Sequence, residues 1–300
     1  MADPMAGNKA IAMLKKAEKE GYGVIGVVSV PSSRRWANAR SPEQYNMETI
    51  VACVRAAEKK RSPLQILLFP WSLTYSPLLV HMAAKACAEA SVPITLHLDH
   101  AQSEEAILTA AEFPFDSIMV DMSHYEKAEN LEKTKRLTAY LHAKGIATEA
   151  EPGRINGGED GVQDTGDLEG LLTTESEAME FVDTGIDFLA PAFGNVHGNY
   201  GGIENIKLDF SRIREATKGK ATLVLHGTNT FPDKIMQGCI KGGMTRCNVN
   251  ELVLYKYSKY VAENTGKVPL TELLETGTGL IQELIEYQMD VMGSTGKADS

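Results

Sequence analysis

Histidines and acidic residues gather at the ends of short apolar segments of this chain. Of its seven histidines, His81 and His142 lie in segments of helical periodicity, and the other five lie at segment ends beside carboxylates. These five are His97, His100, His124, His197 and His226. Three imidazoles that converge beside carboxylates match a divalent-metal site of the zinc type, in which three protein ligands leave a fourth position for a substrate. The sequence therefore predicts a metal site.

One of these segments ends in His97-Leu98-Asp99-His100. Side chains alternate between the two faces of a strand, so His97 and Asp99 point to one side and His100 to the other. His100 can act together with Asp99 only if the strand ends there and the chain bends. We therefore expect only one of the two histidines to be a metal ligand, and His97 to have a structural role.

Carboxylates next to the predicted metal site indicate what the metal would serve. A metal that polarises a carbonyl group, together with acids that move protons, suits chemistry next to a ketone, such as enolate formation. A Schiff-base route to the same enolate would need a lysine at the end of a strand, and none of the strands predicted below contains one. The sequence therefore favours metal-assisted chemistry.

Short segments rich in valine, isoleucine, leucine and phenylalanine alternate with longer segments of helical periodicity. Most of these short segments lack polar alternation, as expected of parallel strands buried on both faces. The predicted strands are Val24–Val30, Leu64–Phe69, Ile94–His100, Ser117–Ser123, Ile146–Glu151, Phe188–Phe193, Thr222–His226 and Arg246–Asn250. The predicted helices are Met47–Lys60, Leu78–Ala90, Glu104–Ala111, Lys127–Ala143, Ser176–Asp183, Lys234–Gly238 and a last helix over Leu270–Met292.

Eight strand-plus-helix units indicate an α/β fold, the (β/α)8 or TIM barrel. We expect one domain over residues 10–300, preceded by an N-terminal tail over residues 1–9. A doubly wound open sheet is the alternative, but it would need a glycine-rich turn after the first strand, where the chain reads Ser29-Val30-Pro31-Ser32-Ser33. In a barrel the active site lies at the carboxyl ends of the strands, where the histidines are.

The segment Pro152–Leu172 is rich in glycine and aspartate and has neither helical nor strand periodicity. A segment of this length without regular structure in a compact domain is usually a functional lid or a disordered insertion. Because it follows the fifth predicted strand, we expect a lid over the mouth of the barrel.

Composition excludes several classes of protein. An apolar content of 43% over 300 residues is too high for a disordered chain. A net charge of −10 without any dense basic run argues against a nucleic-acid partner. The start of the chain does not resemble a secretory signal, and no segment is apolar enough to span a membrane, so we expect a cytoplasmic protein with no membrane partner. Four cysteines without Cys-x-x-Cys spacing indicate neither disulfides nor a structural zinc site.

Seven motifs carry a family resemblance. They are HLDH at 97–100, VDMSH at 120–124, EAEPGRINGGEDGV at 149–162, GNVHGNY at 194–200, LVLHG at 223–227, NVN at 248–250 and GSTGKA at 293–298. Together they resemble the class II, metal-dependent fructose-bisphosphate aldolases, in the family's order and at its spacing, from about residue 10 to the C-terminus.

The resemblance implies a zinc site at the mouth of the barrel. His100, His197 and His226 match the family's catalytic zinc ligands. Asp121 and Glu151 match residues that hold a metal in a second, buried position. The implied cofactor is therefore one catalytic Zn²⁺, with a second position open to a metal.

The resemblance also implies the groups that move protons. Asp99 matches the acid/base at the C4 hydroxyl, Glu159 matches the acid/base at the enediolate carbon, and Asn248 matches the amide that orients the dihydroxyacetone phosphate part. The implied reaction is the reversible cleavage of fructose 1,6-bisphosphate to dihydroxyacetone phosphate and glyceraldehyde 3-phosphate through a zinc-bound enediolate. Carbonyl groups around Val196, Gly198 and Gly227 would hold a monovalent cation near a substrate phosphate.

The positions that match phosphate-binding residues depart from the family's pattern. After His226 the family usually reads Gly-Gly-Ser-Gly, whereas this chain reads Gly227-Thr228-Asn229-Thr230. Glu251 stands where the family has a threonine, and the family's arginine a few residues later has no counterpart. A carboxylate beside a phosphate dianion repels it by on the order of a few kcal/mol when both are poorly solvated. The substrate-binding residues that we expect are Gly198, Gly227, Thr228, Asn229 and Asn250.

The leading hypothesis is a zinc-dependent aldolase with fructose 1,6-bisphosphate as its default substrate. One alternative is an aldolase of the same mechanism for tagatose bisphosphate or a less phosphorylated ketose. An alternative from another class is a catalytically silent barrel that binds a metal. The resemblance also implies a homodimer or homotetramer whose partner is a small phosphorylated sugar.

Overall fold

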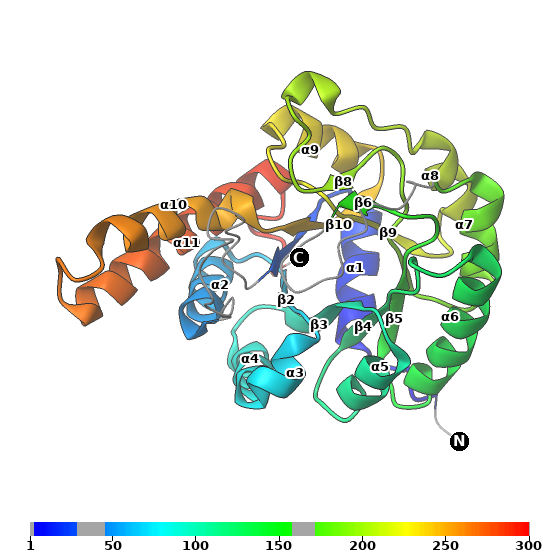
Figure 1. Cartoon of the computed structure of the whole chain (residues 1–300), viewed down its shortest axis with the longest axis horizontal. Helices are drawn as coiled ribbons and strands as arrows, with labels where there is room; N and C mark the ends of the chain where they lie inside the picture. The colour runs from blue at the N-terminus through cyan, green and yellow to red at the C-terminus, as the bar shows by residue number, and fades with distance from the viewer. Residues whose placement is uncertain (1–2, 29–45, 158–171, 300) are drawn as a thin grey trace.

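The computed structural model describes residues 3–28, 46–157 and 172–299. Within them, eight parallel strands close into a barrel in the spatial order β1–β10–β9–β7–β5–β4–β3–β2, with β2 paired back to β1 (Figure 1). The barrel strands are β1 (Val24–Val28), β2 (Leu64–Leu68), β3 (Ile94–Ala101), β4 (Ser117–Val120), β5 (Ala147–Ala150), β7 (Phe188–Leu189), β9 (Thr222–Leu225) and β10 (Met244–Val249). This closed barrel confirms the predicted fold and excludes the open sheet.

Every barrel strand lies within one of the predicted segments or differs from it by a few residues at an end. All residues of these strands are buried, which explains why their sequences show apolar runs rather than alternation. Several predicted strands extend further than the observed ones at the carboxyl end. In β4, for example, regular pairing stops at Val120, and Asp121–Ser123 belong to the loop that follows. The prediction was too long there because these loop residues are buried as well.

The predicted helices are all present, with shifts of a few residues at their ends. The helices are α1 (Lys9–Glu20), α2 (Met47–Lys60), α3 (Trp71–Tyr75), α4 (Pro77–Glu89), α5 (Glu104–Ala110), α6 (Lys127–His142), α7 (Glu175–Val182), α8 (Ser211–Thr217), α9 (Asp233–Lys241), α10 (Glu251–Asn264) and α11 (Leu270–Met292), with a short 3-10 helix η2 (Ile203–Asn205). The sequence prediction did not include α1, α3, α8 or α10.

Helix α1 covers one end of the barrel and lies in the middle of the ring of strands in Figure 1. Its buried residues Ala10, Met13, Leu14 and Ala17 form a separate apolar cluster with inward-facing residues of the strands. The cap residue Asn8 donates its side-chain amide to the carbonyl oxygens that precede β4 and β5, at 2.9 Å each. The helix begins at Lys9, the last residue of the predicted N-terminal tail. Because α1 covers one end of the barrel, the histidine and carboxylate cluster described below lies at the other end.

Helices α10 and α11 form a hairpin that extends away from the barrel (Figure 1). Helix α11 packs against α2 and α10, and only Val253 and Leu254 of α10 are buried. Within the residues that the structure covers, no helix has both the length and the apolar content that a membrane crossing requires.

Candidate active site and metal centre

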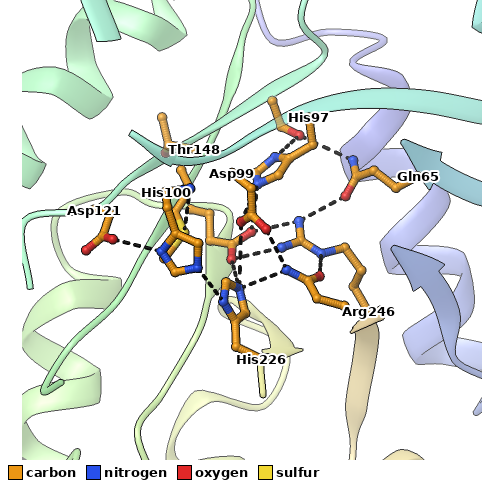
Figure 2. A network of polar contacts seen from close by, with 12 residues as sticks. Gln65, His97, Asp99, His100, Asp121, Thr148, His226 and Arg246 are labelled. Carbon is orange, nitrogen blue, oxygen red and sulfur yellow. Dashed lines mark hydrogen bonds and ion pairs between the residues drawn. The ribbon is translucent and has the colours of Figure 1, made fainter. Parts of the chain in front are cut away.

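The backbone of strand β3 is distorted at His100, one residue before the strand ends at Ala101. The φ angle of His100 is 48°, in the left-handed region that residues other than glycine rarely adopt. The pairing of β3 with β4 shifts at the same place, between Leu98 and Ala101. The regular alternation of side chains along β3 is therefore broken at His100, which is the condition for His100 and Asp99 to act together. As a result, the buried side chains of His100 and Asp99 both lie in the same polar network (Figure 2).

Three histidines from three segments meet at the mouth of the barrel. The Nε2 atom of His100 lies 3.1 Å from Nδ1 of His226, and Nε2 of His197 lies 3.5 Å from the same atom. All three side chains are buried, and their nitrogen atoms lie within 4.8 Å of one another. Nitrogen atoms bound at about 2.1 Å to a tetrahedral zinc ion are roughly 3.4 Å apart. The spacing of these nitrogen atoms thus fits a shared metal ion.

His197 reaches this group from a small sheet outside the barrel, in which β8 (Val196–His197) pairs with β6 (Asn156–Gly157). The pairing needs glycine at position 157, because φ is 99° and a Cβ atom would lie 2.0 Å from the carbonyl oxygen of His197. The sequence did not predict this sheet, because two-residue strands carry no periodicity. It nevertheless supplies the third histidine.

Asp121 orients the ring of His100 through the ring nitrogen that faces away from the other histidines. Its Oδ2 atom lies 2.8 Å from Nδ1 of His100, which leaves Nε2 facing the other histidines. The Ser123 backbone and hydroxyl donate to the second oxygen of Asp121, at 3.1 and 2.7 Å. Burial alone would lower the pKa of His100, but Asp99 and Asp121 outweigh it and raise that pKa to about 10. The negative field that holds a proton on His100 also favours a metal cation in its place.

Glu151 lies beside this pair, and its carboxylate forms a second possible metal-binding group with His100 and Asp121. One oxygen of Glu151 accepts a hydrogen bond from the Ile155 backbone at 2.9 Å. The other is buried and has no hydrogen-bond partner among the residues described. Burial, reinforced by the charge of Asp121, raises the pKa of Glu151 to about 8. A cation here would relieve the cost of this buried, unpaired oxygen.

Arg246 is fully buried inside the barrel, and the sequence prediction gave it no role. Its Nη1 and Nη2 atoms lie 2.8 and 3.0 Å from the two carboxylate oxygens of Glu149. Although burial alone would raise the pKa of Glu149, Arg246 lowers it to about 2, so the carboxylate stays ionised. Glu149 in turn lies 3.0 Å from Nε2 of His226 and so directs Nδ1 of that ring to the histidine group. This arrangement of carboxylate and histidine is typical of metal sites.

Asp99 lies between the histidine group and Arg246. Its Oδ2 atom accepts a hydrogen bond from the side-chain amide of Asn248 at 3.0 Å, and Nε of Arg246 donates to the amide oxygen of Asn248 at 2.8 Å. Despite burial, the charges of His100 and His226 lower the pKa of Asp99. Asp99 and Asn248, both matched to catalytic positions, are therefore in direct contact beside the histidine group.

A sequence model of the class-II fructose-bisphosphate aldolases matches residues 8–297 of the chain. The chain belongs to this family. Its relatives include a candidate fructose-bisphosphate aldolase of Coccidioides immitis, which is 55% identical over 267 residues that cover 85% of this chain and 88% of that protein. The fructose-bisphosphate aldolase of Thermus caldophilus is 31% identical over 316 residues, 96% and 98% of the two chains.

Solved structures support the same family. The crystal structure of a candidate fructose-1,6-bisphosphate aldolase from Coccidioides immitis superposes with a TM-score of 0.90 at 50% identity, and the match covers 98% of this chain and 99% of that chain. The YdjI aldolase from Escherichia coli gives 0.80 at 27% identity, with 97% and 98% covered. These findings confirm the resemblance drawn from the sequence motifs and the expectation of an enzyme, a class II aldolase of the lyase type.

The residues matched to phosphate binding lie near the mouth of the barrel, and two of them already form hydrogen bonds within the protein. The hydroxyl of Thr228 donates to the carbonyl oxygen of Asn248 at 2.6 Å. The carbonyl oxygen of Gly227 accepts the hydroxyl of Tyr200, also at 2.6 Å. Asn250 is buried, and within the described part of the chain its side-chain oxygen has no hydrogen-bond partner.

The other positions that the sequence singled out in this aldolase lie outside the histidine group or outside the described residues. Asn229 and Gly198 are partly exposed, and Glu251 is exposed as the first residue of α10. His124, the remaining strand-end histidine, packs against the ring of Tyr125 and belongs to none of the metal-binding groups found among the described residues. Glu159 and most of the predicted lid lie outside the described residues.

Proposed function

We propose that this member of the class II aldolase family is a zinc-dependent enzyme that cleaves a phosphorylated ketose between C3 and C4. The observation that carries the proposal is the contact of Asp99 and Asn248 beside three histidines whose nitrogen atoms face one another. A protein that only stores a metal does not need a carboxylate beside the coordination position that the three histidines leave open.

His100, His197 and His226 would hold the metal, with Asp121 and Glu149 fixing the orientation of two of the rings. When bound, the metal withdraws electron density from the ketone oxygen of the substrate and so stabilises the negative charge that bond cleavage leaves behind. Asp121 and Glu151 offer a second position that a metal could occupy.

Asp99 takes the proton of the C4 hydroxyl as the C3–C4 bond breaks. Its lowered pKa keeps the carboxylate ionised in the free site, as a proton acceptor must be. The amide of Asn248 donates to Oδ2 and limits rotation of the carboxylate, so that the proton acceptor keeps one geometry. Glu159, carried over from the family's motif, would return a proton to the carbon that becomes the new terminus of the product.

Fructose 1,6-bisphosphate is the default substrate, and two observations favour a second candidate. The Thr228 hydroxyl is already bonded to the Asn248 carbonyl, and Glu251 places a carboxylate at the start of α10, where the family has a threonine. This hydrogen bond and this carboxylate would each weaken the binding of one substrate phosphate. A ketose with a single phosphate is therefore the alternative that these features favour, and tagatose bisphosphate, which differs in stereochemistry but carries both phosphates, is a further candidate of the same mechanism.

The experiment is a cleavage assay over a panel of ketose mono- and bisphosphates, before and after chelation and after zinc is restored. We expect cleavage that chelation abolishes and zinc restores. Asp99→Asn should bind zinc normally but lose cleavage, whereas His226→Ala should lose both. If no ketose phosphate gives chelator-sensitive cleavage, the silent metal-binding barrel replaces this proposal. If the fructose bisphosphate reacts at background rate while another ketose turns over, only the default substrate is wrong.

We also propose that the enzyme works in the cytoplasm as a homodimer or homotetramer. Support comes from apolar side chains exposed on the α10–α11 hairpin, where Tyr255, Tyr287 and Leu270 are 51%, 49% and 67% exposed. Light scattering of the purified protein tests the oligomeric state, and a monomer at assay concentration would contradict it.

A further inference from the structure

His97 lies at the bottom of the site with its Nε2 atom facing two carboxylates. This nitrogen atom is 3.5 Å from Oε2 of Glu149 and 3.7 Å from Oδ1 of Asp99. The side chains of all three residues are at most 1% exposed. Within the described residues, neither Nε2 of His97 nor Oδ1 of Asp99 has a hydrogen-bond partner at normal distance. A buried polar atom without a partner needs an explanation, such as a catalytic role or a bound water molecule or ion.

The orientation of Gln65 is fixed by Arg246. Nη1 of Arg246 lies 2.9 Å from the side chain of Gln65, and because a guanidinium group can only donate, the atom that it meets must be the amide oxygen. The amide nitrogen of Gln65 must then point the other way, where it donates to the hydroxyl oxygens of Thr95 at 3.0 Å and Ser117 at 3.3 Å. The charged group thus determines which way the neutral amide faces.

The Ser117 hydroxyl links the amide of Gln65 to the ring of His97 and determines which ring nitrogen accepts a hydrogen bond. The hydroxyl oxygen accepts from Gln65 and lies 2.7 Å from Nδ1 of His97. Of the described atoms in contact with this hydroxyl, only Nδ1 is left to receive its hydrogen. Nδ1 is then an acceptor, so a neutral His97 carries its proton on Nε2, toward Asp99 and Glu149. Burial and the charge of Arg246 lower the pKa of His97, which favours the neutral ring.

A cation bound by His97, Asp99 and Glu149 would also explain the spacing of these three residues, which form one of the possible metal-binding groups. The guanidinium of Arg246 argues against it, because Nη1 lies 2.8 Å from the same Glu149 oxygen that would bind the cation. A second positive charge there would be repelled at short range in a buried site. A proton on Nε2 satisfies the same oxygens without that repulsion.

We propose that Arg246, Gln65 and Ser117 hold His97 as the Nε2–H tautomer, and that His97 thereby acts as a positioning residue for Asp99. The role of Asp99 rests on the proposed function. The amide of Asn248 donates to Oδ2 and the His97 proton faces Oδ1, so donor groups lie on two sides of the carboxylate. The Nε2–Oδ1 distance exceeds that of a normal hydrogen bond, and catalytic hydrogen bonds often tighten only once a substrate is bound. Removal of this support should therefore lower kcat rather than raise KM.

The first test reads the tautomer itself. ¹⁵N–¹H correlation spectra of metal-free protein report which ring nitrogen of each histidine carries hydrogen, and His97→Gln identifies the signal of His97. We expect Nε2–H in the natural chain and a mixture of both tautomers in Ser117→Ala. A proton on Nδ1, or on both nitrogen atoms, in the natural chain would overturn the inference.

The second test is kinetic and uses a matched control. Ser117→Ala should lower kcat by about tenfold or more with little change in KM, since loss of the correct histidine tautomer is costly in proton transfer. Ser62→Ala removes an equally buried hydroxyl, bonded to Ser294 at 2.8 Å, and should leave kcat unchanged. His97→Gln keeps an N–H donor near the Nε2 position, so it should retain more kcat than His97→Leu.

The two hypotheses can fail separately. If Ser117→Ala loses the tautomer but keeps the kcat of Ser62→Ala, His97 does not position Asp99, although the aldolase proposal stands. If Asp99→Asn cleaves as fast as the natural chain, the proposed role of Asp99 is wrong, and the positioning inference fails with it.

Discussion

Replacement of Arg246 by methionine tests how the buried charges stabilise the barrel. Methionine has a similar length but no charge, so Arg246→Met leaves the Glu149 carboxylate without its counter-ion at a fully buried position. The amide oxygens of Gln65 and Asn248 lose their donors at the same time. Removal of one partner of a buried ion pair costs about 3–5 kcal/mol. We therefore expect the free energy of unfolding to fall by that amount.

The assay is urea unfolding of chelated protein, followed by circular dichroism, so that metal binding does not add to stability. The double variant Arg246→Met/Glu149→Gln should recover part of the loss, because no unpaired charge remains. Arg55→Met is the control, since Arg55 and its partner Glu275 are 44% and 70% exposed and such pairs contribute about 0–1 kcal/mol. The reasoning is refuted if Arg246→Met is no less stable than Arg55→Met, or if the second substitution recovers nothing.

The free energy of unfolding of Arg246→Met should also depend on pH, in a direction opposite to that of the natural chain. In the natural chain the pKa of Glu149 is lowered from 4.5 to about 2, so its stabilising effect is present above 4.5 and is lost as pH falls toward 2. Without Arg246, burial dominates and raises that pKa, so folded protein becomes less stable as pH rises. The stability difference between natural chain and variant should therefore be larger at about pH 8 than at about pH 5.

Three further predictions follow from single contacts. Gly227→Ala should fold poorly and lose activity, because φ is 72° and the new Cβ atom would lie 2.3 Å from the Val196 carbonyl oxygen; Gly219→Ala has the same φ but open space, so thermal unfolding should show a far smaller loss. Glu251→Thr should raise kcat/KM for the bisphosphate by several-fold in steady-state kinetics, and an unchanged value would mean that this carboxylate does not face the phosphate. Glu151→Gln should gain stability relative to the natural chain as pH rises from about 4.5 to about 8 in chelated protein, because a carboxyl group whose pKa is raised to about 8 destabilises the fold on ionising; a pH-independent difference would contradict the assigned burial.

The barrel could be predicted from the sequence because its strands are buried on both faces and therefore read as uninterrupted apolar runs. The bend at His100 could be predicted too, since alternation along β3 conflicted with a joint role for His100 and Asp99. Helix α1 was not predicted, because it precedes the first strand and so falls outside the alternation of strands and helices that indicates the other elements.

Arg246 could not be assigned from the sequence. Its partner Glu149 is 97 positions away in the chain, and the two meet only because closure of the barrel brings the interior side chains of β10 and β5 together, although two strands lie between them. A single arginine in an apolar strand indicates that something buried must neutralise it, but the sequence does not say what. The hydroxyl of Ser117 and the amide of Gln65 were missed for the same reason, since hydrogen-bond direction depends on neighbours from other strands.

Helix α1 has a consequence for how the chain folds during synthesis. Helix α1 is synthesised before every barrel strand, yet the strands that it packs against include β9 and β10, the last strands of the barrel to be made. Until residue 249 has emerged, the apolar face of α1 lacks its final partners and the barrel stays open between β1 and β9. Contacts between the two ends of a chain slow folding, because a long loop must close before they form. The apolar stripe of α1 therefore stays without its full set of partners until the last strand of the barrel has been made.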